Sequence, residues 1–529
     1  MKRLLLLTLA FMAALLPQTV TARAESTKRP ALAVAIVVEG LDYDCLEDLH
    51  PYLRRGGFNR LMDYGVTVSD VDFGSRLDAT AAAAVIMTGA SPSVNGIPAA
   101  TAFSKADRRS LPVFTDRTQL GNFTDETFSP VALRVSTLAD EVRMDAAGLG
   151  SVYALAAQPG VAIVLGGHAA NNGSWISDTT GKWATTTYYK DVPVPMQTLN
   201  HRNPLAQRLD TLAWRPTLDG SSFPDLPSYK RIYQFSYSFP RSNPRRYAAF
   251  KASAPGNREV TDLAIDYLKI FASGKREPLD MINLGYTLQP YPFAREADTR
   301  AELYDAYIRL DADLERLFTA IDAYGPGMNS TLVLLAGTPR SGSAVPDDSK
   351  WQIPSGEFSP ERAVSLLKMN LMSLYGNGDW VAGYHDRQFY LNHDLIKERG
   401  LSVDELRRES ADFLRRLSGV TYAVTVNEVA DTQNSAADSP FPPARNIDID
   451  TAGDVFIAVA PGWTTVSSDG TMSGAERAGG STSPAFILAP GLSRTVIETP
   501  TDARRIAPTV ARLLKVRVPN GAALSPLRF

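Results

Sequence analysis

Three largely apolar runs of strand length recur along the chain, at residues 31–38, 279–287 and 331–337. The first run, ALAVAIVV, is bounded by Pro30 and Gly40. A continuous apolar run, unlike an alternating one, is typical of a strand that is buried on both faces of a parallel sheet. The pattern therefore predicts an α/β fold with a mostly parallel central sheet, in which the carboxyl ends of these strands meet at one edge.

Helical spacing of apolar residues appears between the strands. From Thr299 to Tyr324 apolar side chains return every three or four positions, and Gly325-Pro326 ends the pattern. This predicts a long helix with one buried stripe, and we expect such helices on both faces of the sheet. The run from Gly160 to Tyr189 instead alternates short apolar segments with Gly and Asn, which favours strands joined by turns.

The periodicity weakens between about residue 98 and residue 255, where Gly, Pro, Ser, Asn and aromatic residues accumulate. We interpret this segment as a cap-like insertion within one domain, 25–529, and not as a domain of its own. Roughly 505 mature residues are enough for one large core with one sizeable insertion.

The first 24 residues have the pattern of a cleavable signal peptide. Lys2 and Arg3 precede a short apolar run, and Ala22-Arg23-Ala24 supplies a small-x-small cleavage site before Glu25. We therefore expect an exported protein, periplasmic or secreted, without a transmembrane segment in the mature chain.

Composition excludes several classes of function. The net charge is -3, and removing three cations and no acid with residues 1–24 makes it -6, which argues against a nucleic-acid-binding surface. Cys45 is the only cysteine, so neither an internal disulfide nor a cysteine-based metal site can form. Cys45 lies on an apolar helical pattern with Leu41 and Leu49 and is predicted to be a small core residue.

The segment from Gly74 to Phe103 has the most informative local pattern. A Ser/Asp/Thr turn leads into a helix of small residues that ends at Thr88-Gly89. The first amides of such a helix lack partners within the helix and carry the positive end of its dipole, so the sequence predicts a weak anion site there. Asp78 and Thr80 are the candidate caps of this helix.

This segment resembles the nucleophile region of the exported, two-zinc alkaline phosphatases and the related nucleotide pyrophosphatase/phosphodiesterases. The matching positions are Thr88-Gly89, Pro92 and Gly96-Ile97, and they place the family's nucleophilic Thr on Ala79. The resemblance extends over nearly the whole mature chain. It includes His168 with Trp175, the run AYIRLDADLERL at 306–317 and the terminal run at 503–521.

The same resemblance implies the ligand positions of two zinc ions, and most of them carry other residues here. The seven nucleophile and ligand positions fall on Glu39, Ala79, Thr287, Tyr291, Thr338, Pro339 and Thr482. Only Glu39 is a charged group that can bind zinc. The family's phosphate-binding Asn falls on Ala100, and its Lys-x-Arg pair falls within 157–160, which reads Ala-Gln-Pro-Gly. We therefore expect both zinc ions to be lost.

The sequence thus favours a catalytically inactive relative of these enzymes that acts as a binding or scaffold protein. The ligand or partner is unknown, no cofactor is expected, and the residues expected to line the former metal cleft are Glu39, Thr80, Thr287, Tyr291, Thr338 and Thr482. The alternative is a phosphoric- or sulfuric-ester hydrolase with a rebuilt site made of Glu39, Asp42, Asp78, Thr80 and Thr338. Without a nearby base, the Thr80 hydroxyl would be a weak nucleophile. His168, His385 and His393 are interpreted as packed or surface histidines and not as metal ligands.

Overall fold

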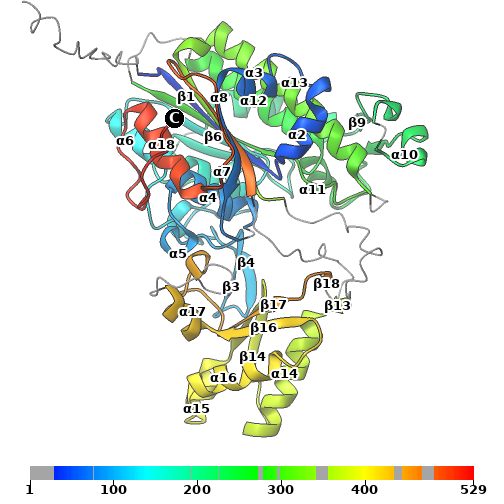
Figure 1. Ribbon diagram of the computed structural model, residues 1–529, viewed down its shortest axis with the longest axis vertical. Coiled ribbons are helices and arrows are strands. Elements are labelled where there is room, and N and C mark those ends of the chain that lie inside the picture. Colours follow the sequence, from blue (N-terminus) through cyan, green and yellow to red (C-terminus); the bar gives the residue numbers. More distant parts are fainter. Residues whose placement is uncertain are drawn as a thin grey trace, which may run out of the picture.

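The computed structural model describes residues 29–529 except 76, 191, 224, 272–277, 295–297, 341–355, 434–443 and 467–481. Its centre is an eleven-stranded sheet in the order β20-β2-β19-β12-β1-β11-β6-β7-β8-β5, with β21 pairing to β2 (Figure 1). The strands are β1 (Leu32–Glu39), β2 (Val66–Asp72), β5 (Gly121–Asn122), β6 (Val152–Ala156), β7 (Asn172–Ile176), β8 (Trp183–Thr186), β11 (Asp280–Thr287), β12 (Thr331–Thr338), β19 (Thr482–Leu488), β20 (Thr495–Ile497) and β21 (Thr501–Asp502).

The predicted fold class is confirmed. The five central strands β12, β1, β11, β6 and β7 are parallel to one another. On one side of them β19 is antiparallel to β12 and β2, and on the other β8 is antiparallel to β7 and β5. The three apolar runs form β1, β11 and β12, which lie side by side at the centre of the sheet.

Helices cover both faces, which explains why the central strands are continuously apolar (Figure 1). Val34 and Ile36 of β1 face a hydrophobic cluster that includes the buried stripe of α13 (Arg300–Tyr324). Ala35 and Val37 face the opposite cluster, which includes α4 (Ala79–Thr88), α7 (Pro159–Gly166) and α18 (Ile506–Leu514). The helices on the first face also include α2 (Tyr43–Leu49), α3 (Phe58–Tyr64) and α12 (Ala254–Phe271), and those on the second include α6 (Leu138–Asp145).

A smaller unit lies beside the central domain and is drawn in yellow in Figure 1. Its antiparallel sheet has the order β14-β15-β17-β16, and its core is separate from the other two clusters. The elements are α14 (Pro360–Tyr375), β14 (Val381–His385), β15 (Gln388–Leu391), α15 (His393–Glu398), α16 (Val403–Leu414), β16 (Val420–Thr425), α17 (Val426–Gln433) and β17 (Val455–Val459).

The segment between about 98 and 255, expected as a cap-like insertion, lies partly within the central sheet, because it supplies β6, β7, β8 and β5. It also supplies the hairpin of β3 (Thr101–Ser104) and β4 (Arg109–Pro112), which reaches the smaller unit, where Phe103 stacks on Tyr390 with ring centroids 4.3 Å apart. The other helices and strands of this segment are α8 (Val194–Arg202), α9 (Leu205–Arg208), β9 (Ala213–Trp214), α10 (Ser228–Ile232), β10 (Tyr237–Ser238) and α11 (Arg246–Lys251). Outside the segment, the structure also contains α5 (Pro92–Asn95), β13 (Gly356–Phe358) and β18 (Trp463–Thr465).

Two predictions concern export and membrane insertion. The predicted signal peptide, 1–24, lies outside the described residues. Among the helices that the structure describes, none combines the length and the apolar character that a bilayer span requires.

Candidate functional site

The carboxyl ends of β1, β11 and β12 meet at one edge of the sheet, as the sequence predicted. In the strand register, Glu39 lies opposite Thr287 of β11 on one side and opposite Thr338 of β12 on the other. The first residue of the antiparallel strand β19, Thr482, lies at the same edge. Four of the residues named from the sequence are therefore brought together, although only Glu39 carries a charge.

Two of these residues are fixed by the fold. The backbone of Thr287 exchanges two hydrogen bonds with the Asn257 side chain: its N–H donates to Oδ1 at 2.9 Å, and its carbonyl accepts from Nδ2 at 2.7 Å. Thr338 is fully buried at the end of β12. Within the described part of the chain its Oγ1 has no hydrogen-bond partner. Neither threonine is a side chain that can hold a divalent zinc ion.

The start of α4 is occupied by the carboxylate of Asp78. One oxygen accepts a hydrogen bond from the Ala81 amide at 2.9 Å, and the other accepts from the Ala100 amide at 2.6 Å. Burial raises the pKa of Asp78, whereas these amide hydrogen bonds act in the opposite direction. The anion site expected at this helix start is therefore already filled, at Ala81, by the chain's own carboxylate.

Thr80 packs between two helices. Its side chain is only 4% exposed, and a Cβ added to Gly160, in the first turn of α7, would lie 2.6 Å from Thr80 Oγ1. Because glycine at position 160 permits this close approach, the Thr80 hydroxyl forms part of the contact between α4 and α7. Ala79, at the nucleophile position, is the first residue of α4 and carries no functional group.

Tyr291 belongs to an aromatic cluster. Its ring centroid lies 5.0 Å from that of Trp214, 4.8 Å from Tyr237 and 5.8 Å from Phe293. Only 4% of Tyr291 is exposed, and burial raises its pKa to about 12. At neutral pH the phenol is therefore protonated, and the position that resembles a zinc-binding histidine is part of a packed core.

Within the residues that the structure describes, no three His, Cys, Asp or Glu side chains come close enough to hold a metal ion together. Two histidines named from the sequence lie in the smaller unit and bind other groups. His393 Nε2 lies 2.8 Å from Asp454 Oδ1, and His385 Nδ1 lies 2.8 Å from Ser110 Oγ. Their contacts therefore hold elements of the fold together.

Sequence reasoning missed Arg340, which follows the end of β12 by two residues. Its Nη2 lies 3.5 Å from Asp42 Oδ2. Burial opposes its charge, but the neighbouring Tyr307, Asp42 and Cys45 side chains raise its pKa above the ordinary value. Burial also raises the pKa of the Cys45 thiol to about 12, which leaves it neutral. The available signal was an arginine shortly after a buried strand that ends at Thr338, which the resemblance places at a zinc-ligand position.

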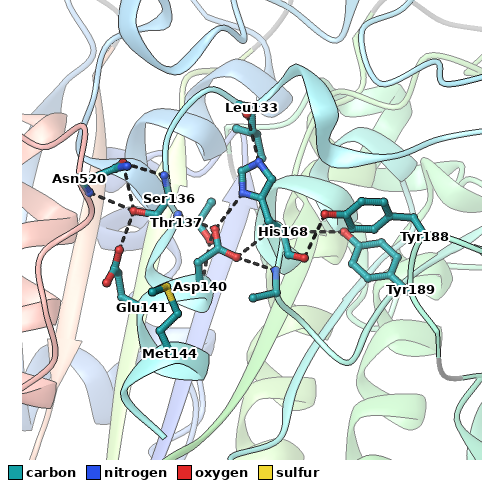
Figure 2. Close-up of polar contacts among 12 residues, drawn as sticks. Leu133, Ser136, Thr137, Asp140, Glu141, Met144, His168, Tyr188, Tyr189 and Asn520 are labelled. Atoms are coloured by element: carbon teal, nitrogen blue, oxygen red, sulfur yellow. Dashed lines mark hydrogen bonds and ion pairs between the residues drawn. The ribbon is translucent and has the colours of Figure 1, made fainter. Parts of the chain in front are cut away.

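His168 lies between two acceptors, as Figure 2 shows. Its Nδ1 lies 3.2 Å from Asp140 Oδ2, and its Nε2 lies 3.1 Å from the carbonyl oxygen of Leu133. A carboxylate and a carbonyl both accept, so both ring nitrogens are bonded only when both carry a proton. The hydrogen bond to Asp140 accordingly raises the pKa of His168, although burial opposes this.

This arrangement predicts a pH-dependent contribution to stability. Because the pKa of His168 is higher in the folded than in the unfolded protein, its contribution is complete below about pH 6.5 and is lost as the pH rises through the folded value. The free energy of unfolding should therefore differ more between the parent protein and His168→Gln at pH 5.5 than at pH 8.5. The exposed His50→Gln serves as the control, and an equal difference at both pH values would contradict the prediction.

Comparisons with known proteins identify the family and the fold of the chain. The family model described as type I phosphodiesterase / nucleotide pyrophosphatase matches residues 33–483. The chain is 25% identical over 533 residues to a protein named calcium-transporting ATPase from Myroides odoratus, with 95% of each chain covered. It is 26% identical over 536 residues to alkaline phosphatase PhoV from Synechococcus elongatus, with 96% of this chain and 92% of PhoV covered. The crystal structure of wild-type alkaline phosphatase PafA has the same fold, with a TM-score of 0.81, 22% identity, and 95% of this chain and 99% of that chain covered.

Proposed function

The chain belongs to the type I phosphodiesterase / nucleotide pyrophosphatase family, and from this premise we propose that it is a catalytically inactive member that acts as a binding or scaffold protein. The observation that carries the proposal is the register that places Glu39 between Thr287 and Thr338. Zinc needs imidazole, thiolate or carboxylate ligands, and these three strand ends supply a single carboxylate. Ala79 in turn offers no nucleophile.

The alternative function is a hydrolase with a rebuilt site, and the contacts that its candidate residues make in the fold weigh against this alternative. Both oxygens of Asp78 accept hydrogen bonds from backbone amides, and Thr80 is packed against Gly160. Asp42 caps α2 by accepting from the Cys45 amide at 3.2 Å. Asp78 and Thr80 would have to give up these structural contacts before they could act on a substrate, and Asp42 has one of its two oxygens engaged in the cap.

A hydrolysis assay separates the two functions. The purified protein is incubated with a chromogenic phosphate monoester, a phosphate diester and a sulfate ester, with and without added zinc. The proposal expects no hydrolysis above that of a denatured control. Zinc-dependent hydrolysis that disappears in Glu39→Ala would establish the hydrolase and overturn the proposal.

Restoring the nucleophile alone should not restore activity. Ala79→Thr returns a hydroxyl to the family position, but its activation requires a metal that lowers its pKa and cations that stabilise the developing charge. Parts of a cooperating site are of little use singly, so we expect hydrolysis to stay at the level of the parent protein, with zinc present. Appreciable zinc-dependent phosphatase activity in Ala79→Thr would show that a working metal site exists.

We also infer that the protein is exported. This rests on the N-terminal sequence, in which Lys2 and Arg3 precede an apolar run and Ala22-Arg23-Ala24 precedes Glu25. The intact mass of the protein recovered from its native compartment should correspond to a chain that begins at Glu25. A mass that still includes residues 1–24 would contradict cleavage.

A further inference from the structure

The guanidinium of Arg340 carries two buried donors without a hydrogen-bond partner, although one of them, Nη2, forms a long ion pair with Asp42. Its Nε and Nη2 atoms are both shielded from solvent, and neither has a hydrogen-bond partner within the described part of the chain. These two atoms form the edge of the guanidinium that binds both oxygens of a carboxylate or phosphate in parallel. Buried polar groups without partners are rare in native proteins, so this pair of donors requires an explanation, such as a bound ion.

The nearest carboxylate, Asp42, forms a long ion pair with Arg340 and is held in place by other contacts. Asp42 Oδ2 lies 3.5 Å from Arg340 Nη2, which is too long for a good hydrogen bond. The other oxygen, Oδ1, accepts from the Cys45 amide at the start of α2. In addition, the Asp42 amide donates to the Tyr307 hydroxyl at 2.9 Å, which fixes the backbone at this position. Asp42 is thus held in place as the cap of α2.

We propose that Arg340 binds a small oxyanion, a molecule bearing a carboxylate, phosphate or sulfate group, through Nε and Nη2. The site lies just beyond the end of β12, where Thr338 Oγ1 is a second buried group without a hydrogen-bond partner in the described residues. The proposal deepens the proposed function and rests on it, because it assigns this edge of the sheet an organic or inorganic anion in place of zinc.

The binding should be weak. Asp42 lies beside the guanidinium, and Glu39 ends the neighbouring strand, so two carboxylates oppose an incoming anion. We therefore expect a Kd on the order of 1 mM for inorganic phosphate. Specificity should come from the paired donors of the guanidinium and not from charge alone, which separates this site from a general basic surface.

The test measures binding of inorganic phosphate, sulfate and acetate to the metal-free full-length protein, prepared in buffer passed over chelating resin. Thermal unfolding reports all three anions, and line broadening of the phosphorus-31 signal reports phosphate directly. We expect at least one anion to raise the unfolding midpoint of the parent protein. Arg340→Gln and Arg340→Lys should each weaken that binding about tenfold or more, since lysine keeps the charge but loses the paired donors.

Two further variants make the result decisive. Arg416→Gln removes an exposed arginine of the smaller unit and should leave anion binding unchanged. Asp42→Asn removes the competing charge but keeps an oxygen for the Cys45 amide, so it should tighten binding several-fold. No anion effect on the parent protein, or an effect that Arg340→Gln and Arg340→Lys leave intact, would overturn the inference. Zinc measured in the protein as purified tests the proposed function separately.

Discussion

Replacing Asp140 with alanine is expected to lower the free energy of unfolding by roughly 3–5 kcal/mol. Asp140 is 2% exposed and accepts backbone hydrogen bonds from Thr137 at 2.8 Å, His168 at 2.7 Å and Ala169 at 2.7 Å. These bonds join the start of α6 to the turn after α7, and Figure 2 shows Asp140 at the centre of the group. Removing the carboxylate leaves several buried donors without an acceptor, and each such donor is costly.

The matched control is Asp145→Ala in the same helix. Asp145 is partly exposed and forms an ion pair with Arg29, so its loss should cost less than about 1 kcal/mol. Chemical denaturation of the three proteins at pH 7 gives both differences. Similar losses for Asp140→Ala and Asp145→Ala would show that the buried hydrogen bonds contribute little.

The second large effect is expected at Trp214, whose replacement with alanine should cost about 3–5 kcal/mol. The side chain is 2% exposed, its ring packs against Tyr291 and Phe235, and its Nε1–H donates to Asp305 Oδ2 at 2.6 Å. Alanine would leave a cavity beside Tyr291 and remove one donor from a buried carboxylate.

Tyr233→Ala is the control for this change. Tyr233 belongs to the same stretch of chain but is 76% exposed, so its loss should change stability by no more than about 0.5 kcal/mol. Denaturant midpoints and slopes, measured together, distinguish a loss of stability from a change in the unfolded state. A Trp214→Ala protein as stable as Tyr233→Ala would mean that the aromatic cluster does not hold the segment after β11.

The centre of the fold could be predicted because the sequence patterns that indicate its strands and helices are local. The apolar runs that form β1, β11 and β12 are continuous and bounded by turn residues, and the long helix α13 (Arg300–Tyr324) begins within one residue of its predicted start. The helix α4 ends at Gly89, whose left-handed φ of 67° suits glycine at that position.

Other elements could not be predicted because they depend on tertiary contacts. The run from Gly160 to Gly166 was predicted as a strand, but it forms the helix α7, which starts at Pro159 and packs on α4. A short buried apolar run lacks the periodicity that distinguishes a strand from a helix. Proline at the first helical position, Pro159, favours the helix because its fixed φ angle suits a helix start. The separate core of the smaller unit was likewise not recognised.

The candidate site likewise combines features that the local sequence predicts with features that depend on tertiary contacts. The positions of Glu39, Thr287 and Thr338 follow from the strand pattern, and the register confirms that they are neighbours. Tyr291 packs on Trp214, and Arg340 lies close to Asp42. Both contacts join segments far apart in the sequence, so no local sequence pattern predicts them.

The most direct test of the central claim is the zinc content of the purified protein, measured by elemental mass spectrometry after dialysis against buffer with micromolar zinc. An inactive member without a metal site should retain well below one zinc ion per chain, and Glu39→Ala should retain the same amount. Two zinc ions per chain, reduced in Glu39→Ala, would contradict the account, because the edge at Glu39, Thr287 and Thr338 would then hold the metal that we propose it has lost.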